Sequence, residues 1–364
     1  MTLLLAPMEG LLDHSLRDAL TQVGGIDRCV SEFIRVTDML LPERVFFRIV
    51  PELAQGGRTD AGVPVRPQLL GSDPACLADN AARVAGLGPD GVDLNFGCPA
   101  KVVNRHGGGA SLLDDPELLF RIARAVRAAV PAHQVVSAKM RLGVNDSALS
   151  VACAQALAEG GVSEIVVHAR TKADAYRPPA WWDRLVPIRE AVSVPLVANG
   201  EIWTVDDALR CQAESGCDAL MLGRGMVADP GLALAIRAAW ATGGSAPTTP
   251  LPWASMLTLM ARFSIQIESH VVPKHRAGRI KQWLNYLRRR YPEAQEAYAR
   301  LRTQNDVRAL CAELFAGLPE ADRYTPYLSE HLLPHGRDFQ GERDVNLRSE
   351  ECCTDGAGAV AQDP

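Results

Sequence analysis

The segment Gly91–Lys101 ends a short apolar run with side chains that could do chemistry. Its first residues are typical of a buried strand, and Asn95 and Cys98 stand where that strand should end. Gly97 and Pro99 predict a turn that projects the thiol out of the sheet, at a cost in stability. A lone cysteine is more often a small buried apolar residue. The turn, and the amide one strand repeat below it, make Cys98 our candidate catalytic residue.

Eight short apolar runs alternate with segments of helical periodicity up to about residue 240. This repeat, over that length, predicts an α/β fold, a closed (β/α)8 TIM barrel, rather than a doubly wound sheet. The predicted strands are Leu3–Met8, Cys29–Arg35, Val65–Gly71, Gly91–Gly97, Val135–Leu142, Glu164–Arg170, Pro195–Gly200 and Ala219–Gly223. The helices predicted between them include Leu77–Gly86, Pro116–Ala129, Ala148–Glu159 and Val205–Ser215.

Polar residues gather at the ends of these predicted strands, where barrel enzymes build their sites. A single lysine or histidine there is more often solvated or satisfied by a neighbour. Their recurrence on nearly every strand predicts a ligand across the barrel mouth, because inward-pointing polar groups are costly without partners.

The predicted ligand is a phosphorylated cofactor. Gly223 and Arg224 offer close backbone approach and a guanidinium where barrels commonly bind phosphate. Lys139 could hold negative charge on an electron-accepting ring, and Gln68 could pair with polar groups of that ring. No Gly-x-Gly-x-x-Gly segment follows the first strand, which argues against a Rossmann dinucleotide site.

Composition narrows the class of protein further. The 364 residues are 47% hydrophobic and 22% charged, as in ordinary soluble globular proteins. Nine scattered cysteines without a Cys-x-x-Cys pair indicate neither a disulfide framework nor a zinc site, so we expect no metal. No apolar window long enough to span a membrane and no signal peptide is evident, and we expect a cytoplasmic protein.

The chain divides into four predicted parts. Residues 1–240 should form the barrel, the Gly/Pro/Thr-rich residues 241–252 a linker, and residues 253–318 a small helical bundle. Residues 319–364 are expected to be a partly disordered extension. The predicted bundle helices are Trp253–Ile267, Arg279–Arg290, Pro292–Arg302 and Asp306–Phe315.

The predicted bundle carries a basic segment on an acidic protein. Lys274–Arg302 contains nine Lys and Arg against two Glu, a net charge of +7, whereas the whole chain carries −5. A charge run on helices is usually a solvated face. Its contrast with the acidic remainder, and the aromatics Trp283, Tyr286 and Tyr291 within it, favour a phosphate-binding surface and hence a nucleic-acid partner.

Taken together, seven motifs resemble those of the flavin-dependent tRNA-dihydrouridine synthases, over about residues 3–318. Glu32–Val36 and Gly278–Leu284 are similar to the bacterial C-type enzymes, which act on uridine 16 of the D-loop. The seven motifs are Ala6–Gly10, Asn95–Pro99, Gly107–Ala110, Lys139–Gly143, His168–Thr171, Asn199–Ile202 and Gly223–Gly225.

The resemblance implies FMN in the barrel mouth and NADPH as its reductant. Hydride would pass from flavin N5 to uracil C6, and Cys98 would protonate C5 from the opposite face. A thiol with an unperturbed pKa of about 8.5 is mostly protonated at neutral pH, as a general acid must be. The implied FMN contacts are Pro7, Met8, Glu9, Gln68, Lys139, His168, Asn199, Gly200, Glu201, Gly223 and Arg224.

The resemblance also implies a tRNA substrate. A uridine inside folded tRNA must swing out to reach a barrel mouth, at a cost of a few kcal/mol that distributed phosphate contacts can offset. The implied uracil and nucleotide contacts are Asn95, Arg141 and Tyr176, and the expected RNA-placing residues are Arg35, Lys274, Arg276, Arg279, Lys281 and Arg290.

Two alternatives remain open at the level of sequence. One is a barrel flavoenzyme for a small molecule such as dihydroorotate, which would have no use for the basic bundle. The other is an RNA-binding or RNA-folding module with a vestigial site. For the synthase itself we expect a monomer without an obligate protein partner.

Overall fold

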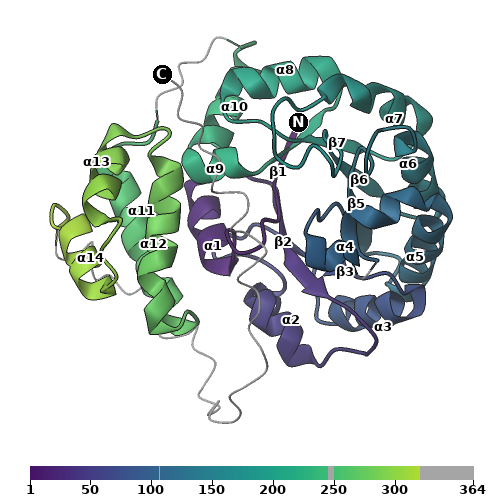
Figure 1. Ribbon diagram of the computed structural model, residues 1–364, viewed down its shortest axis with the longest axis horizontal. Helices are drawn as coiled ribbons and strands as arrows, with labels where there is room; N and C mark the ends of the chain where they lie inside the picture. The colour runs from purple at the N-terminus through teal and green to yellow at the C-terminus, as the bar shows by residue number, and fades with distance from the viewer. Residues whose placement is uncertain (106, 245–249, 320–364) are drawn as a thin grey trace. The chain divides into compact units, whose positions relative to one another are not determined.

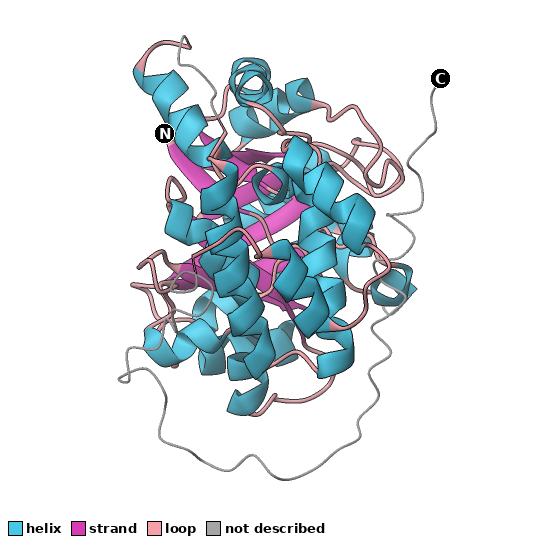
Figure 2. Ribbon diagram, turned by 90° about the vertical axis from the view of Figure 1, so that its left-hand side faces the viewer, coloured by secondary structure: helices cyan, strands magenta, loops and turns pink. Residues whose placement is uncertain are grey.

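The computed structural model describes residues 1–105, 107–244 and 250–319, shown in Figures 1 and 2. The chain separates into two compact units, the first spanning Met1–Pro250 and the second beginning at Leu251. The structure describes only part of the predicted linker 241–252, since residues 245–249 lie outside the described residues. The linker is flanked by α10 (Leu232–Ala241) and α11 (Trp253–Gln266). Most of the predicted 319–364 extension also lies outside them.

The first unit is a closed barrel of eight parallel strands, each paired with its neighbours in the sequence, so the predicted (β/α)8 fold is confirmed. Several strands end earlier than predicted, for example before Pro7, Gly200 and Gly223, because proline lacks an N–H and glycine favours a turn. The strands are β1 (Thr2–Leu5), β2 (Arg28–Arg35), β3 (Val65–Leu70), β4 (Gly91–Phe96), β5 (Val135–Arg141), β6 (Glu164–His168), β7 (Leu196–Asn199) and β8 (Ala219–Leu222).

Helices alternate with the strands and cover the outside of the barrel, as Figure 1 shows. Asp73 and Asp115 cap helices whose first residue is proline, which is why α3 begins three residues before its predicted start. Besides α10, the helices of the first unit are α1 (His14–Val23), α2 (Glu43–Ile49), α3 (Pro74–Ala85), α4 (Lys101–Arg105), α5 (Pro116–Ala129), α6 (Ser150–Glu159), α7 (Val186–Ala191), α8 (Val205–Ser215) and α9 (Arg224–Ala228). Short 3-10 turns are η1 (Pro51–Gln55), η2 (Gly109–Asp114) and η3 (Trp182–Leu185).

The barrel interior is filled in layers. An apolar layer contains Leu4, Ala6, Val30, Val166, Val197 and Met221. Nearer the amino ends of their strands, Arg28 and Arg66 reach the carboxylate of Glu164, with N–O distances of 2.6 and 3.0 Å. Because side chains of a strand alternate between two faces, residues two positions after the apolar layer also point inward, at the carboxyl end of the barrel. That end is the mouth.

The second unit is a helical bundle of α11, α12 (Pro273–Leu287), α13 (Pro292–Leu301) and α14 (Val307–Leu314), with the short turn η4 (Ile267–Ser269). Phe263 and Trp283 meet edge to face in its core, with ring centroids 5.1 Å apart. The predicted start of the second helix at Arg279 is wrong, because Pro273 occupies the first turn and starts the helix six residues earlier.

Two sequence expectations concern cysteines and membranes. Every cysteine that the structure describes is a free thiol. In the described part of the chain, none of the helices has both the length and the apolar character that a bilayer crossing requires.

Candidate active site

Neighbouring strands β3 to β7 bring the predicted polar residues together at the mouth. Asn95 of β4 is in register with Lys139 of β5, and His168 of β6 with Asn199 of β7. Lys139 is in register with Val166, whereas His168 is in register with Arg141, so His168 and Asn199 lie two residues beyond Asn95 and Lys139 along their strands. The four residues therefore occupy two successive levels at the carboxyl ends of neighbouring strands.

The Cys98 turn is held by side-chain hydrogen bonds. Asn95 Oδ1 accepts the backbone N–H groups of Gly97 and Cys98, at 3.0 and 2.9 Å. The Cys98 carbonyl in turn accepts from Asn104 Nδ2 at 2.9 Å and from the backbone N–H of Ala110 at 3.0 Å. The thiol is half-buried, and both sides of its turn are fixed.

Gly109 closes the loop that returns to this turn. Its φ of +62° disfavours any side chain, and a Cβ there would lie 2.7 Å from the Cys98 carbonyl oxygen. We expect Gly109→Ala to lower the free energy of unfolding in urea by about 2–4 kcal/mol, from backbone strain plus the clash. Gly107→Ala is the matched control, because Gly107 has φ +70° but nothing within 4 Å. That control should cost only about 1 kcal/mol, and equal losses for the two variants would contradict the close contact.

Gln68 lies beneath this turn and is fully buried. Its Nε2 donates to Asp93 Oδ2 and its Oε1 accepts from Asn95 Nδ2, both at 2.7 Å. Both polar atoms of the amide therefore already have a protein partner, and its contact with a cofactor ring stays a prediction.

Lys139 and His168 share an electropositive environment. Burial, reinforced by Arg141, lowers the pKa of Lys139 to about 8. Burial and the neighbouring cations, Arg141 first, hold the pKa of His168 well below its ordinary value. At neutral pH the imidazole is therefore neutral and the lysine largely charged.

Arg141 is almost fully buried and joins two loops. Its Nε donates to the Gly97 carbonyl at 2.8 Å, and its Nη1 donates to the carbonyls of Thr171 and Ala175, both at 2.9 Å. Its guanidinium lies 5.3 Å from the ring centroid of Tyr176, which is 48% exposed. Arg141 thus holds the Cys98 turn against the loop that carries Tyr176.

Glu201 organises a second group of cations. Its carboxylate pairs with Arg170 and lies 3.4 Å from Arg224 Nη2, and it accepts from Trp203 Nε1 at 2.9 Å. Burial opposes ionisation of Glu201, but the hydrogen bonds from Arg170 and Trp203 and the two positive charges hold its pKa below the ordinary value. Its side chain therefore orients Arg224.

The remaining predicted residues lie at the ends of β1, β7 and β8. Glu9 is exposed, beyond Pro7, while Asn199 Nδ2 donates to the Met221 carbonyl at 2.7 Å. Gly200 has φ +121°, and a Cβ there would lie 2.7 Å from His168 Cδ2. A Cβ on Gly223 would meet the sulfur of Met8 only at 3.7 Å. Glycine at position 200 thus leaves room for the imidazole.

Comparison with known proteins decides the family. The family model described as dihydrouridine synthase (Dus) matches residues 4–329, most of the chain. The chain belongs to the dihydrouridine synthase family. It is 56% identical to the tRNA-dihydrouridine(16) synthase of Ralstonia nicotianae over 84% of this chain and 92% of that protein. It is 54% identical to the protein of the same name from Cupriavidus necator, over 88% of this chain and 98% of the other.

The chain resembles the following solved structure in fold alone. Histamine dehydrogenase from Rhizobium sp. 4-9 superposes with a TM-score of 0.51 at 14% identity, covering 72% of this chain and 48% of that one. The resemblance inferred from the sequence motifs is thus confirmed at the level of family and of barrel fold.

The basic residues expected to place RNA divide into two kinds. Lys281 Nζ donates to the Arg302 and Gln304 carbonyls and to Asn305 Oδ1, at 3.2, 2.8 and 3.0 Å. Arg276 donates to the Val271 and Glu268 carbonyls, at 2.8 and 2.7 Å. The structure therefore gives both residues a role inside the bundle, which their sequence positions did not reveal.

The other expected RNA contacts are more accessible. Lys274 and Arg290 are exposed on the bundle, and Arg35 is exposed at the end of β2. Arg279 donates to Gln282 and lies 5.9 Å from the ring centroid of Phe263, so part of its side chain packs on the bundle core.

Arg170 is a candidate site residue that the sequence analysis did not single out. It is fully buried, and its carboxylate partner lies at the end of the next strand. The available sequence signal was its place in the motif His168–Thr171, at the end of a predicted strand, because an arginine buried there would need a carboxylate partner.

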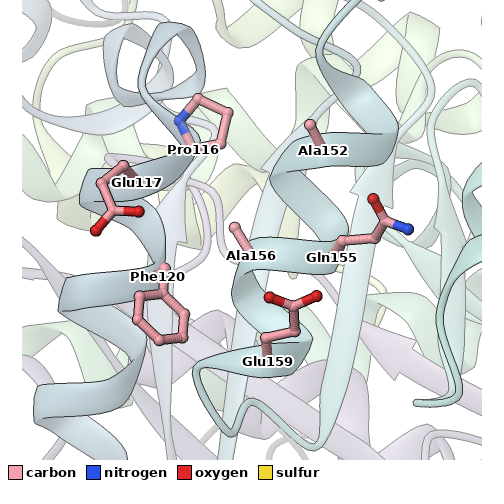
Figure 3. A pocket seen from close by; sticks show the side chains of 7 residues that line it. All are labelled: Pro116, Glu117, Phe120, Ala152, Gln155, Ala156 and Glu159. Carbon is pink, nitrogen blue, oxygen red and sulfur yellow. The ribbon is translucent and has the colours of Figure 1, made fainter.

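A groove on the outside of the barrel is separate from these residues. It lies between α5 and α6, with a volume of about 280 Å³, and Figure 3 shows Glu117 and Phe120 on one helix facing Gln155 and Glu159 on the other. None of the candidate site residues lines it.

Proposed function

We propose that the chain is an FMN-dependent, NADPH-driven tRNA-dihydrouridine synthase that reduces uridine 16 in the D-loop. Membership of the family and two relatives named for position 16 support this reaction and position. The structural observation that carries the proposal is the Cys98 turn after β4, because Lys139 and Arg141 lie near enough to Cys98 for the thiol to affect their pKa values. We also propose that the enzyme acts as a monomer in the cytoplasm.

The mouth fits an anionic cofactor. Lys139, Arg141, Arg170 and Arg224 lie close enough to His168 to lower its pKa, and the carboxylate of Glu201 pairs with only two of these cations. Arg170 Nη1 is buried without a hydrogen-bond partner among the described residues. An excess of positive charge and an unsatisfied donor suit the phosphate of FMN.

The residues that would hold FMN follow from this arrangement. Lys139 and His168 would face the ring, with Arg224 toward the phosphate, and the predicted contacts of Gln68 and of the β1 and β7 ends remain part of the proposal. When bound, FMN would take electrons from NADPH and supply hydride to C6 of the uracil.

The chain's own residues would complete the reduction. Cys98 would hold a proton on its sulfur and release it to C5, as a general acid. Arg141 fixes the turn that carries this thiol and supports Tyr176, whose exposed ring could contact the nucleotide. Lys139 would stabilise negative charge that develops on the cofactor ring.

The bundle would bind the RNA. Lys274, exposed on α12, is proposed to contact phosphate, whereas Lys281 supports the joint between α13 and α14. Lys274→Met should weaken tRNA binding about 2-fold to 5-fold and reduce the slope of log K against log salt by about 1, with unfolding unchanged. Lys281→Met should instead cost about 1–3 kcal/mol of stability.

Titrations of tRNA at several salt concentrations, together with urea unfolding of both variants, check this division. A salt slope that falls for Lys281→Met but not for Lys274→Met would contradict it.

The proposed activity is tested on defined RNA. Purified protein with FMN and NADPH should form dihydrouridine in an unmodified tRNA transcript, mapped by mass spectrometry to position 16. A transcript with cytidine at that position is the control. Reduction of dihydroorotate or another free small molecule, without any product in tRNA, would favour the alternative flavoenzyme. Binding of tRNA without product under any reductant would favour the RNA-binding module.

A further inference from the structure

A line of hydrogen bonds runs from the barrel interior to the backbone of Cys98. It begins at Asp93 of β4, whose Oδ1 accepts from Ser137 Oγ at 2.5 Å and whose Oδ2 accepts from Gln68 Nε2 at 2.7 Å. Gln68 Oε1 accepts from Asn95 Nδ2 at 2.7 Å. Asn95 Oδ1 then accepts the backbone N–H of Cys98 at 2.9 Å. Asp93 thus connects to the thiol-bearing turn through two amides.

The two ends of this line fix its direction. A carboxylate oxygen accepts at one end, and backbone N–H groups can only donate at the other. Gln68 and Asn95 lie between, each with one donating and one accepting group, so only one head-to-tail order satisfies all the bonds. Asp93 and Gln68 are fully buried and Asn95 is 8% exposed, so water cannot readily replace a lost partner.

The charge state of Asp93 does not alter this order. Burial raises the pKa of Asp93, while hydrogen bonds from Ser137 and Gln68 and the nearby Arg66 oppose that rise. A proton on Oδ1 would be shared with Ser137 and would leave Oδ2 free to accept from Gln68. The direction of the line is therefore the same with or without the proton.

We propose that Asp93 is a positioning residue that holds the Cys98 thiol in place by orienting the side-chain amides of Gln68 and Asn95. This inference rests on the proposed function, because it assumes that the thiol is the acid. Asp93 contributes no atom to the reaction. It dictates that Asn95 turns its oxygen, and not its nitrogen, toward the turn.

An exchange of isosteric side chains tests the direction of the line. Asn95→Asp puts a carboxylate oxygen opposite Gln68 Oε1, and if Gln68 flips to relieve this, its oxygen faces Asp93. We expect a kcat loss of about tenfold or more, because small displacements of a reacting group have large effects. Asp93→Asn should lose only about 2-fold to 3-fold, because the Ser137 hydroxyl can rotate to accept from the new amide.

The double variant Asp93→Asn/Asn95→Asp can run the whole line in reverse. Asn at position 93 would donate to Gln68, Gln68 to Asp at position 95, and the carboxylate would still accept both backbone N–H groups. It should recover most of the kcat lost in Asn95→Asp. A double variant no better than Asn95→Asp would overturn the proposal, as would full turnover of Asp93→Ala, which removes the anchor.

A second readout separates this proposal from the proposed function. The rate of Cys98 alkylation by iodoacetamide in the FMN-loaded protein, followed on the Cys98 peptide by mass spectrometry, reports the turn without tRNA. This rate should change in Asn95→Asp and return toward wild type in the double variant. If wild-type protein formed no dihydrouridine, the proposed function would fail. The alkylation rates would still test the hydrogen-bond order from Asp93 to Cys98. Alkylation rates equal in all variants would overturn the proposal.

Discussion

Replacing Cys98 by Ala should abolish nearly all dihydrouridine formation while leaving FMN in place. Loss of a positioned general acid typically lowers the rate by about 10²–10⁴-fold. The turn is held by hydrogen bonds to the backbone of Cys98, and alanine keeps that backbone. Single-turnover reduction of tRNA by pre-reduced enzyme measures the loss.

The control for this variant is the reductive half-reaction. Reduction of FMN by NADPH should proceed within about 2-fold of wild type, since the thiol is proposed to act only on the uracil. Cys98→Ser should fall between the two proteins, because a hydroxyl can donate a proton but with a higher pKa. Full turnover in Cys98→Ala would remove the thiol from the mechanism.

Replacing Lys139 by Met should stabilise the FMN-free protein while it weakens FMN binding. The folded chain holds the pKa of Lys139 at about 8, against 10.5 for an unperturbed lysine. Between these values the unfolded chain binds more protons, so this lysine makes stability rise with pH, and below about pH 8 its full penalty is present. With part of the side chain exposed, the gain at pH 7 should be about 2 kcal/mol.

Urea unfolding of FMN-free protein at several pH values checks this sign. The advantage of Lys139→Met should shrink as pH rises from 8 toward 10.5, and the variant should bind FMN at least about tenfold more weakly. Lys274→Met, with an exposed lysine in the bundle, is the matched control and should track wild type at every pH. A pH-independent difference between Lys139→Met and wild type would contradict the buried charge.

The barrel was predictable because its rules are local. Runs such as Ile165–Val167 are apolar and β-branched, and polar residues follow them, which marks both the strand and the face that carries the site. Asn95 and Lys139 lie level with each other, and His168 lies level with Arg141 two residues further on, because each residue is near the end of its strand.

What each polar atom contacts was not predictable. Lys281 and Lys274 look alike in the sequence, yet one donates three hydrogen bonds within the bundle and the other is exposed. Arg170 was overlooked because its acceptor Glu201 comes from a different strand, 31 residues away. Such roles depend on distances between segments that no single-sequence pattern records.

The hydrogen bonds of Arg141 have a consequence for evolutionary change in this enzyme. The Arg141 guanidinium donates hydrogen bonds both to the turn of Cys98 and to the loop of Tyr176, so a shift of either segment would disturb the other. If Tyr176 contacts the nucleotide as proposed, a change in its loop would also disturb the proton transfer proposed for Cys98. We therefore expect new substrate preferences to arise first from changes in the bundle, the proposed RNA-binding unit, which leave both barrel loops unchanged.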